Sequence, residues 1–92
     1  MTQKSDLESL TIAGLLALET AREKHPKFAE GQYEALGVIR EEIREFTKAI
    51  EKESVARAVE EAMDAKATLE RFILGEHLPE GNRGFGWWER VK

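Results

Sequence analysis

The chain has 92 residues, no cysteine and a formal net charge of −4 at pH 7. This length holds a single domain, and the lack of cysteine excludes disulfides, thiolate metal sites and cysteine nucleophiles. The acidic balance, without a cluster of Lys or Arg, disfavours nucleic-acid binding, and no apolar run approaches the roughly 20 residues of a membrane span. Since the N-terminus also lacks the apolar segment of a signal peptide, we expect a cytoplasmic protein that binds neither nucleic acid nor membrane.

The first predicted helix runs from a cap at Ser5 or Asp6 to about Lys24. Pro26 ends it, because proline lacks a backbone N–H and forces the preceding residue out of the helical region. Apolar and small residues occur on more than one side of this helix: Leu7, Leu10, Gly14, Leu15, Leu16, Leu18 and Ala21. A chain of this size buries only roughly 60–65% of its unfolded surface, so we expect a homodimer or homotetramer that assembles through this helix and the next one.

Two further helices are predicted after a short connection. The second runs from about Tyr33 to Lys52, and the third follows Ser54, a good N-cap residue, and ends at Gly75. Their apolar residues recur at helical spacing: Leu36, Ile39, Ile43, Phe46 and Ile50, then Val55, Val59, Ala62, Leu69 and Ile73. No segment alternates with a period of two. We therefore predict an all-α fold, an antiparallel helical hairpin plus the N-terminal helix, which assembles into a multi-subunit helical bundle.

Residues 76–92 differ in composition from the rest of the chain, being rich in glycine and aromatic residues. We expect a loop or arm there and no fourth long helix. One hypothesis is that Trp87 or Trp88 stacks on a nucleobase, a contact worth roughly 1–3 kcal/mol. The alternative, which we favour, is an arm whose tryptophans anchor on a neighbouring subunit.

Two acidic pairs with the same spacing are the most informative feature of the sequence. Glu42 and Glu45 are three residues apart on the second predicted helix, where they share a face. Glu61 and Asp64 have the same spacing on the third. The pairs mirror each other about Glu53, where the hairpin turns. Folding there places Glu42 opposite Asp64. It also places Glu45 opposite Glu61, so that four carboxylates converge.

Four converging carboxylates repel one another unless a cation neutralises them. An all-oxygen ligand set suits Mg²⁺, or Mn²⁺, better than zinc or copper. The alternative is that these are ordinary solvated helix acids paired with nearby Arg and Lys side chains. A carboxylate di-iron centre is excluded, because it needs Glu-x-x-His and neither His25 nor His77 follows a Glu at that spacing.

The motif E-E-I-R-E, from Glu41 to Glu45, is followed along the chain by E-A-M-D, from Glu61 to Asp64. This pattern resembles the E-E-x-x-E and E-x-x-D signature of the all-α NTP pyrophosphohydrolases, the MazG-like superfamily, over about residues 28–74. The resemblance implies a MazG-like domain over residues 1–75, with the arm over residues 76–92. It also implies Mg²⁺-dependent hydrolysis of a nucleoside triphosphate substrate between its α- and β-phosphates.

Carried over to this chain, the resemblance assigns roles to the acidic residues. The implied metal ligands are Glu42, Glu45, Glu61 and Asp64. Glu45 is also the candidate general base on the attacking water. Glu41 is the other motif residue assigned to catalysis, and it is less directly tied to the metal.

Substrate contacts are less defined, because the Lys and Asn that many members carry beyond E-x-x-D have no clear equivalent here. Lys66, Thr68 and Arg71 are the nearby candidates for phosphate contact, and Trp87 is the candidate for the base. Lys66 equally fits a lysine that extends to solvent at a subunit seam, and Arg71 fits an ordinary ion pair. The chain is also short for the family, so a complete nucleotide pocket should need a second subunit.

The leading prediction is therefore a nucleotide pyrophosphohydrolase that releases a nucleoside monophosphate and pyrophosphate. The alternative is a non-catalytic helical oligomerisation or interaction module, whose acidic residues are surface charge.

Overall fold

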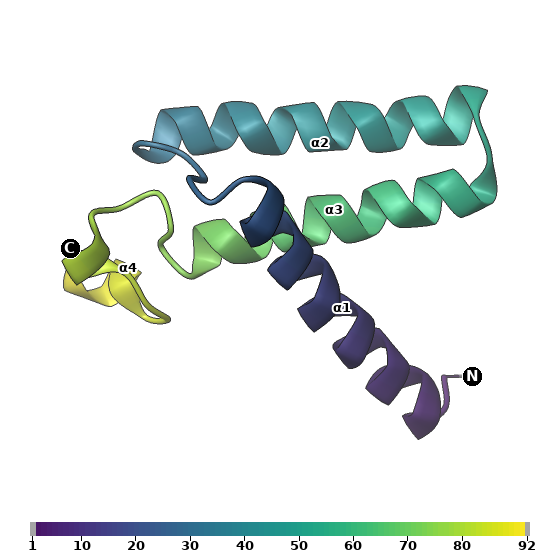
Figure 1. Cartoon of the computed structure of the whole chain (residues 1–92), viewed down its shortest axis with the longest axis horizontal. Helices are drawn as coiled ribbons and strands as arrows, with labels where there is room; N and C mark the ends of the chain where they lie inside the picture. The colour runs from purple at the N-terminus through teal and green to yellow at the C-terminus, as the bar shows by residue number, and fades with distance from the viewer. Residues whose placement is uncertain (1, 92) are drawn as a thin grey trace.

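The computed structural model describes residues 2–91, and within that range it is built from helices without any strand (Figure 1). The three long helices are α1 (Lys4–Lys24), α2 (Gln32–Lys52) and α3 (Val55–Ile73), followed by a 3₁₀ turn, η1 (Glu80–Asn82), and a short α4 (Trp87–Arg90). The predicted all-α hairpin with an N-terminal helix is confirmed. No helix in the described range is both long enough and apolar enough to cross a membrane.

The helix ends follow local capping chemistry. The N-cap of α1 is Gln3, whose backbone N–H donates to the Asp6 carboxylate at 3.2 Å, so the predicted cap at Ser5 or Asp6 is wrong. The predicted end at Lys24 is confirmed. At the start of α3 the Ser54 hydroxyl accepts the backbone N–H of Arg57 at 3.1 Å, as the sequence predicts.

Gly75 ends α3 through its left-handed backbone. Its φ of +74° is a conformation that glycine adopts without strain. Two hydrogen bonds then close the helix end, from Gly75 N–H to the carbonyl of Phe72 and from Glu76 N–H to that of Arg71, both at 2.9 Å. This turn sends the chain back along the end of the hairpin.

Helices α2 and α3 lie antiparallel, and α1 crosses α3 with its N-terminal half projecting away from the hairpin (Figure 1). Small buried side chains let the hairpin helices approach closely: Ala35, Ala49, Ala58, Ala65 and Ala67. A compact cluster of Phe28 and Ala29, with Ala35, Val38 and Phe72, holds the α1–α2 connection against the hairpin. No large side chain in the described range is fully buried, so the core is thin.

Much of the apolar surface remains exposed in the single chain. On α1 the leucines and isoleucine of the projecting half are each at least half exposed: Leu7, Leu10, Ile12, Leu15 and Leu16. On the hairpin, large parts of the predicted apolar seams are also exposed: Leu36, Ile43, Ile50, Val55, Val59, Leu69 and Ile73. Monomeric proteins rarely expose large contiguous apolar patches.

The C-terminal arm folds back onto the end of α3 in its own chain. The Trp87 indole N–H donates to the Ile73 carbonyl at 2.9 Å, and its ring packs edge-on against Phe72 and His77. The carbonyl of His77 accepts the backbone N–H of Gly31 at 2.9 Å, which ties the arm to the start of α2. Trp87 is therefore anchored within its own chain. The favoured sequence prediction placed the tryptophans on a neighbouring subunit and did not include this contact.

His77 should make folding stability sensitive to mildly acidic pH. Its side chain stacks on Phe72 at 4.5 Å, the residue is 5% exposed, and Nδ1 has no hydrogen-bond partner among the described residues. Burial lowers the pKa of His77 below its usual value of about 6.5. As the pH falls below that value the unfolded chain gains a proton that the folded chain does not take up, so the free energy of unfolding decreases until the folded pKa is reached.

His77→Phe keeps a stacking ring without the titrating nitrogen, so it should flatten this dependence. Urea unfolding of both chains at about pH 7.5 and about pH 5.5 measures it, with at most about 1.4 kcal/mol lost per pH unit in the wild type. Equal losses in the two chains would show that His77 does not titrate in this way.

Candidate metal centre

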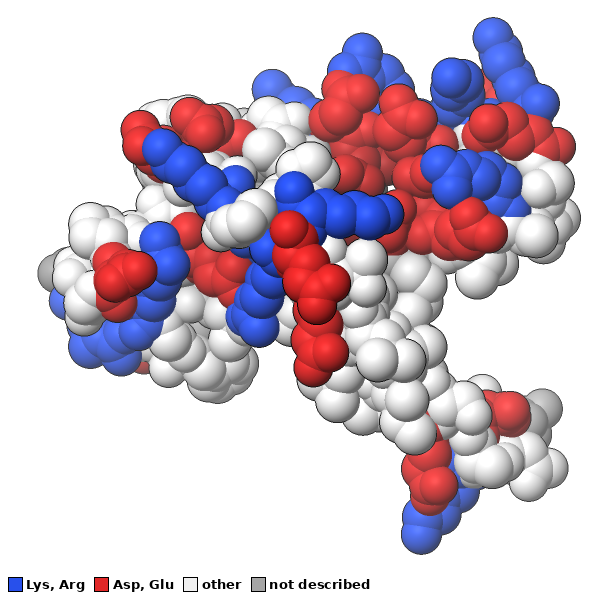
Figure 2. Space-filling view, viewed as in Figure 1, with Lys and Arg blue, Asp and Glu red and all other residues white. Residues whose placement is uncertain are grey.

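Three of the four predicted carboxylates converge on the facing sides of α2 and α3. One carboxylate oxygen from each of Glu42, Glu61 and Asp64 lies within 4.8 Å of the other two. Glu61 is only 4% exposed, Glu42 is half-buried and Asp64 is exposed, so the cluster extends from the hairpin interior to solvent. Figure 2 shows acidic side chains gathered over α2 and α3, whereas most of the projecting part of α1 is uncharged.

The cluster is electrostatically strained as three carboxylates. Burial is the largest cause of a raised pKa at Glu42, and the negative charges of Asp64, Glu61 and Glu45 raise it further. The charge of His25 acts in the opposite direction and lowers it. Glu61 is partly neutralised by an ion pair with Arg57, one turn before it on α3. No comparable cation pairs with Glu42 or Asp64 among the described residues, so this part of the cluster is the place where an added cation would relieve the most repulsion.

Glu42→Gln should raise the free energy of unfolding of the metal-free chain at pH 7 by roughly 0.5–1 kcal/mol. The reason is that each pair of like charges at helical spacing destabilises the fold by a few tenths of a kcal/mol. In the wild type, the ionised Glu42 lowers the free energy of unfolding by its full amount above the raised folded pKa of Glu42. This destabilisation disappears as the pH falls to the pKa of Glu42 in the unfolded chain, about 4.5. Urea unfolding in a chelator measures it. The control, Glu41→Gln, should stay within about 0.5 kcal/mol of the wild type, and an equal or lower stability for Glu42→Gln would contradict the repulsion.

The remaining two motif acids lie outside the cluster. Glu45 is half-buried one turn after Glu42, and it forms no hydrogen bond or ion pair with another described residue. Its charge still acts on Glu42. Glu41 is exposed and paired with Arg44 on its own helix. The structure thus brings Glu42, Glu61 and Asp64 together and leaves Glu45 beside them as a free carboxylate. Glu41 stays exposed and lines the same pocket as Glu42 and Asp64.

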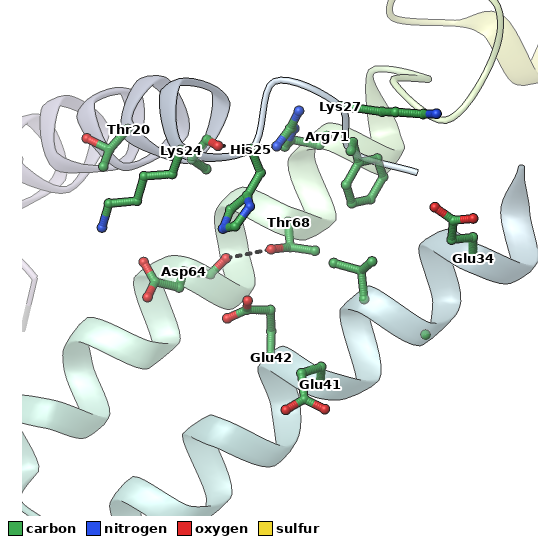
Figure 3. A pocket seen from close by; sticks show the side chains of 14 residues that line it. Thr20, Lys24, His25, Lys27, Glu34, Glu41, Glu42, Asp64, Thr68 and Arg71 are labelled. Carbon is green, nitrogen blue, oxygen red and sulfur yellow. Dashed lines mark hydrogen bonds between the residues drawn. The ribbon is translucent and has the colours of Figure 1, made fainter. Parts of the chain in front are cut away.

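A pocket of about 720 Å³ opens next to Glu42 and Asp64 (Figure 3). Its size is in the range of sites for small ligands. One wall is made by α2 and α3, and the other by the end of α1 and the connection that follows it: Thr20, Ala21, Lys24, His25, Lys27 and Phe28. The His25 ring points from this second wall toward Thr68, Asp64 and Glu42 (Figure 3).

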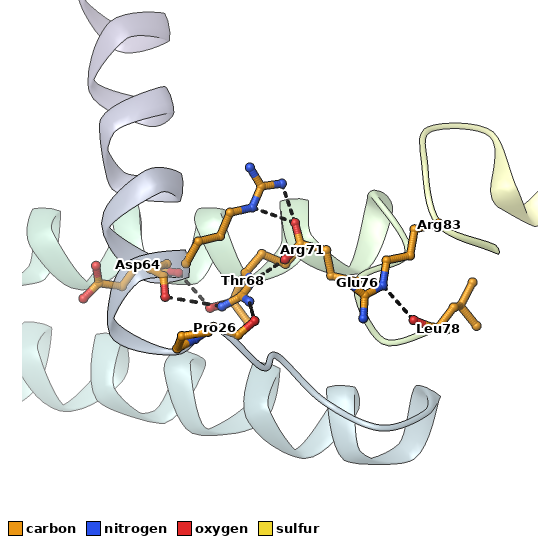
Figure 4. A network of polar contacts seen from close by, with 9 residues as sticks. Pro26, Asp64, Thr68, Arg71, Glu76, Leu78 and Arg83 are labelled. Carbon is orange, nitrogen blue, oxygen red and sulfur yellow. Dashed lines mark hydrogen bonds and ion pairs between the residues drawn. The ribbon is translucent and has the colours of Figure 1, made fainter. Parts of the chain in front are cut away.

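The four predicted substrate contacts lie in different places. Arg71 lines the pocket but is 3% exposed, and its guanidinium is held by Glu76 at 2.7 Å and by two backbone carbonyls (Figure 4). Lys66 does not line the pocket; it pairs with Glu70 at 3.3 Å under Gly14 of α1. Trp87 lies in the aromatic cluster at the end of α3. Thr68 lines the pocket with its hydroxyl donating to the Asp64 carbonyl at 2.9 Å.

Lys24 and His25 are pocket residues to which the sequence interpretation gave no role. The signal that could have found them is Pro26, which ends α1 and therefore places both residues at the helix end, where the chain turns toward α2. Their position opposite the acids depends on how α1 crosses α3.

Comparisons of the chain with protein-family models, with curated proteins and with solved structures find no match.

Proposed function

We propose that the protein is a Mg²⁺-dependent nucleoside triphosphate pyrophosphohydrolase. The observation that carries the proposal is the convergence of Glu42, Glu61 and Asp64 from two helices, with oxygens within 4.8 Å of one another, at the edge of a pocket large enough for a nucleotide. The resemblance of the motifs to the all-α NTP pyrophosphohydrolases supports the same reaction. The alternative of a surface-charge module accounts for Glu61 through its ion pair with Arg57, but not for the unpaired Glu42 and Asp64 beside it.

The three carboxylates fit a hard divalent cation. Their donor atoms are all oxygen, which suits Mg²⁺ or Mn²⁺. Burial raises the pKa of Glu42 most, and the neighbouring carboxylates raise it further by a repulsion that such a cation would remove. Glu42, Glu61 and Asp64 would hold the metal, which when bound neutralises phosphate oxygens and lowers the pKa of coordinated water.

The proposed reaction is hydrolysis at the α-phosphorus. The oxygen of a water molecule bonds to that phosphorus, and the bond from phosphorus to the oxygen bridging the α- and β-phosphates breaks. The bridging oxygen leaves with pyrophosphate, and the other product is the nucleoside monophosphate. Glu45 takes the proton from the attacking water, because it is the one motif carboxylate that is half-buried beside the cluster and free of an ion pair.

A substrate screen tests the proposal. The wild-type chain is incubated with each standard nucleoside triphosphate and deoxynucleoside triphosphate and with oxidised or deaminated ones, with Mg²⁺ or with a chelator. We expect release of pyrophosphate, with the matching monophosphate in equal amount, in Mg²⁺ alone. Release of inorganic phosphate without pyrophosphate, or no release from any nucleotide, would contradict the proposed reaction.

The proposal includes assembly into a homodimer or homotetramer. Its support is the exposed apolar surface of α1, the thin core, and an apolar groove of about 340 Å³ near the turn of the hairpin, which Phe46, Ile50 and Val59 help to line. Association would bury these surfaces.

We expect sedimentation at micromolar concentration to give two or four times the chain mass of 10.5 kDa. Ile12→Glu places a charge in the exposed apolar part of α1 and should shift the chain toward monomer. A wild-type monomer under these conditions would contradict the assembly.

A further inference from the structure

Lys24 and His25 form a polar wall that faces the acidic cluster across the pocket. Lys24 is the last residue of α1 and His25 is its C-cap, and both line the pocket with Glu42 and Asp64 (Figure 3). Lys24 forms no ion pair with any residue in the described range, although acids lie on the opposite wall. Lys27 also lines the pocket, but it is already paired with Glu30.

Arg71 holds this wall in place from beneath. Its guanidinium donates to the carbonyl of Ala21 at 3.4 Å and to that of Pro26 at 3.3 Å, one on each side of Lys24 and His25 (Figure 4). Glu76 and the ring of Phe28, 5.2 Å from the guanidinium carbon, complete its surroundings. Arg71 is therefore engaged by the protein itself, and its buried position makes it a support for the wall.

The hydrogen bonds from Arg71 also change the electrostatics of the wall. The carbonyls at the C-terminal end of a helix carry partial negative charge and repel anions. Here the Ala21 carbonyl accepts both the His25 backbone N–H and Arg71, so a buried cation lies against this negative end and partly offsets its charge. The exposed group at the helix end is then the Lys24 ammonium, a compact charge well suited to phosphate.

We propose that Lys24 and His25 bind the β- and γ-phosphates of the substrate, and thus the pyrophosphate leaving group. This inference rests on the proposed function and extends it by naming the groups that contact the phosphates. The proposed metal carboxylates lie on one wall of the pocket and the Lys24–His25 pair lies on the other. A polyphosphate would therefore be held between the divalent cation on one side and the Lys24 ammonium on the other. Lys24 and His25 supply the phosphate contacts that the sequence predicted for Lys66 and Arg71. Lys66 lies beneath α1, and Arg71 is engaged in holding the fold, so neither is placed to make these contacts.

Isothermal titration with inorganic pyrophosphate in Mg²⁺ tests the inference. Lys24→Gln should weaken pyrophosphate binding at least about tenfold, and His25→Gln should weaken it several-fold, because each removes a charge-assisted or hydrogen-bonding contact. The matched control is Lys48→Gln, an exposed lysine on α2 outside the pocket, which should bind within about twofold of the wild type. Thermal unfolding with Mg²⁺ alone should give all four chains the same shift.

The outcomes separate the inference from the proposed function. Equal pyrophosphate affinity in the wild type and Lys24→Gln would overturn the inference and show that Lys24 only complements the helix end. Wild-type chain that responds to Mg²⁺ but does not bind pyrophosphate would overturn it as well and leave the metal site standing. Wild-type chain that does not respond to Mg²⁺ would overturn the proposed function, and the inference with it.

Discussion

Asp64→Asn should abolish pyrophosphate release, with a loss of at least about 100-fold in rate, since even residues behind metal ligands contribute 10–100-fold. Asp64 is the exposed member of the carboxylate cluster, and its side chain forms no ion pair in the described range. Its backbone carbonyl accepts the Thr68 hydroxyl, a contact that the substitution preserves. The change therefore removes a negative charge and one carboxylate oxygen of the proposed metal site, while the hairpin keeps its packing.

The expected rate loss is measured as pyrophosphate release at saturating Mg²⁺, with far-UV circular dichroism to verify the helices. Glu41→Gln is the matched control, because Glu41 belongs to the same pair of acidic motifs but lies outside the carboxylate cluster, exposed and paired with Arg44. It should keep most of the activity. Comparable activity in Asp64→Asn and the wild type would remove Asp64 from the site.

Arg71→Met should destabilise the fold by about 3–5 kcal/mol, the cost of breaking a buried ion pair by removing one partner. The substitution leaves the Glu76 carboxylate with one cation and removes the Arg71 donor from the Pro26 carbonyl. The Ala21 carbonyl keeps only the His25 backbone N–H. Folded domains are stable by only about 5–15 kcal/mol, so this is a large fraction of the total. Urea unfolding of wild type and variant gives the difference.

Arg22→Met is the control for Arg71→Met. Arg22 pairs with the same Glu76 carboxylate, but its side chain is 44% exposed, so its loss should cost no more than about 1 kcal/mol. An Arg71→Met chain as stable as Arg22→Met would contradict the role of Arg71 as the buried support of the α1–α2 connection.

The same network sets a pH dependence at the acidic end. Burial alone would raise the pKa of Glu76, but the hydrogen bonds and charges of Arg22 and Arg71 outweigh it and hold the pKa below the usual value of about 4.5. The stabilisation is present above that value and is lost as the pH falls through the folded pKa. Arg71→Met should therefore lose less stability than the wild type over this acidic range.

Most of the fold could be predicted because its signals are local. Pro26, Ser54 and Gly75 mark helix ends through backbone chemistry, and the spacing of apolar residues marks the long helices. The Gln3 cap was missed because glutamine is not among the preferred capping residues. The docking of Trp87 on the Ile73 carbonyl was missed because it depends on how the arm folds back, which no periodicity encodes.

The candidate site could be predicted in part for the same reason. Mirror spacing about the turn correctly predicts that Glu42 and Asp64 approach each other, and Glu61 joins them. Glu45 stands apart because residues three positions apart differ by about 60° around a helix, so both members of a pair do not face the partner helix equally. The Lys24–His25 wall could not be predicted, because its position depends on how α1 crosses α3, which is a long-range packing feature.

Thermal unfolding during a Mg²⁺ titration tests the metal site most directly, with wild type and Asp64→Asn measured side by side. The wild-type chain should be stabilised along a saturating curve, by about 2.7 kcal/mol at one hundred times the dissociation constant. Asp64→Asn should show a much weaker response at the same concentrations. Identical responses of the two chains, or no response in either, would contradict a metal centre on Glu42, Glu61 and Asp64.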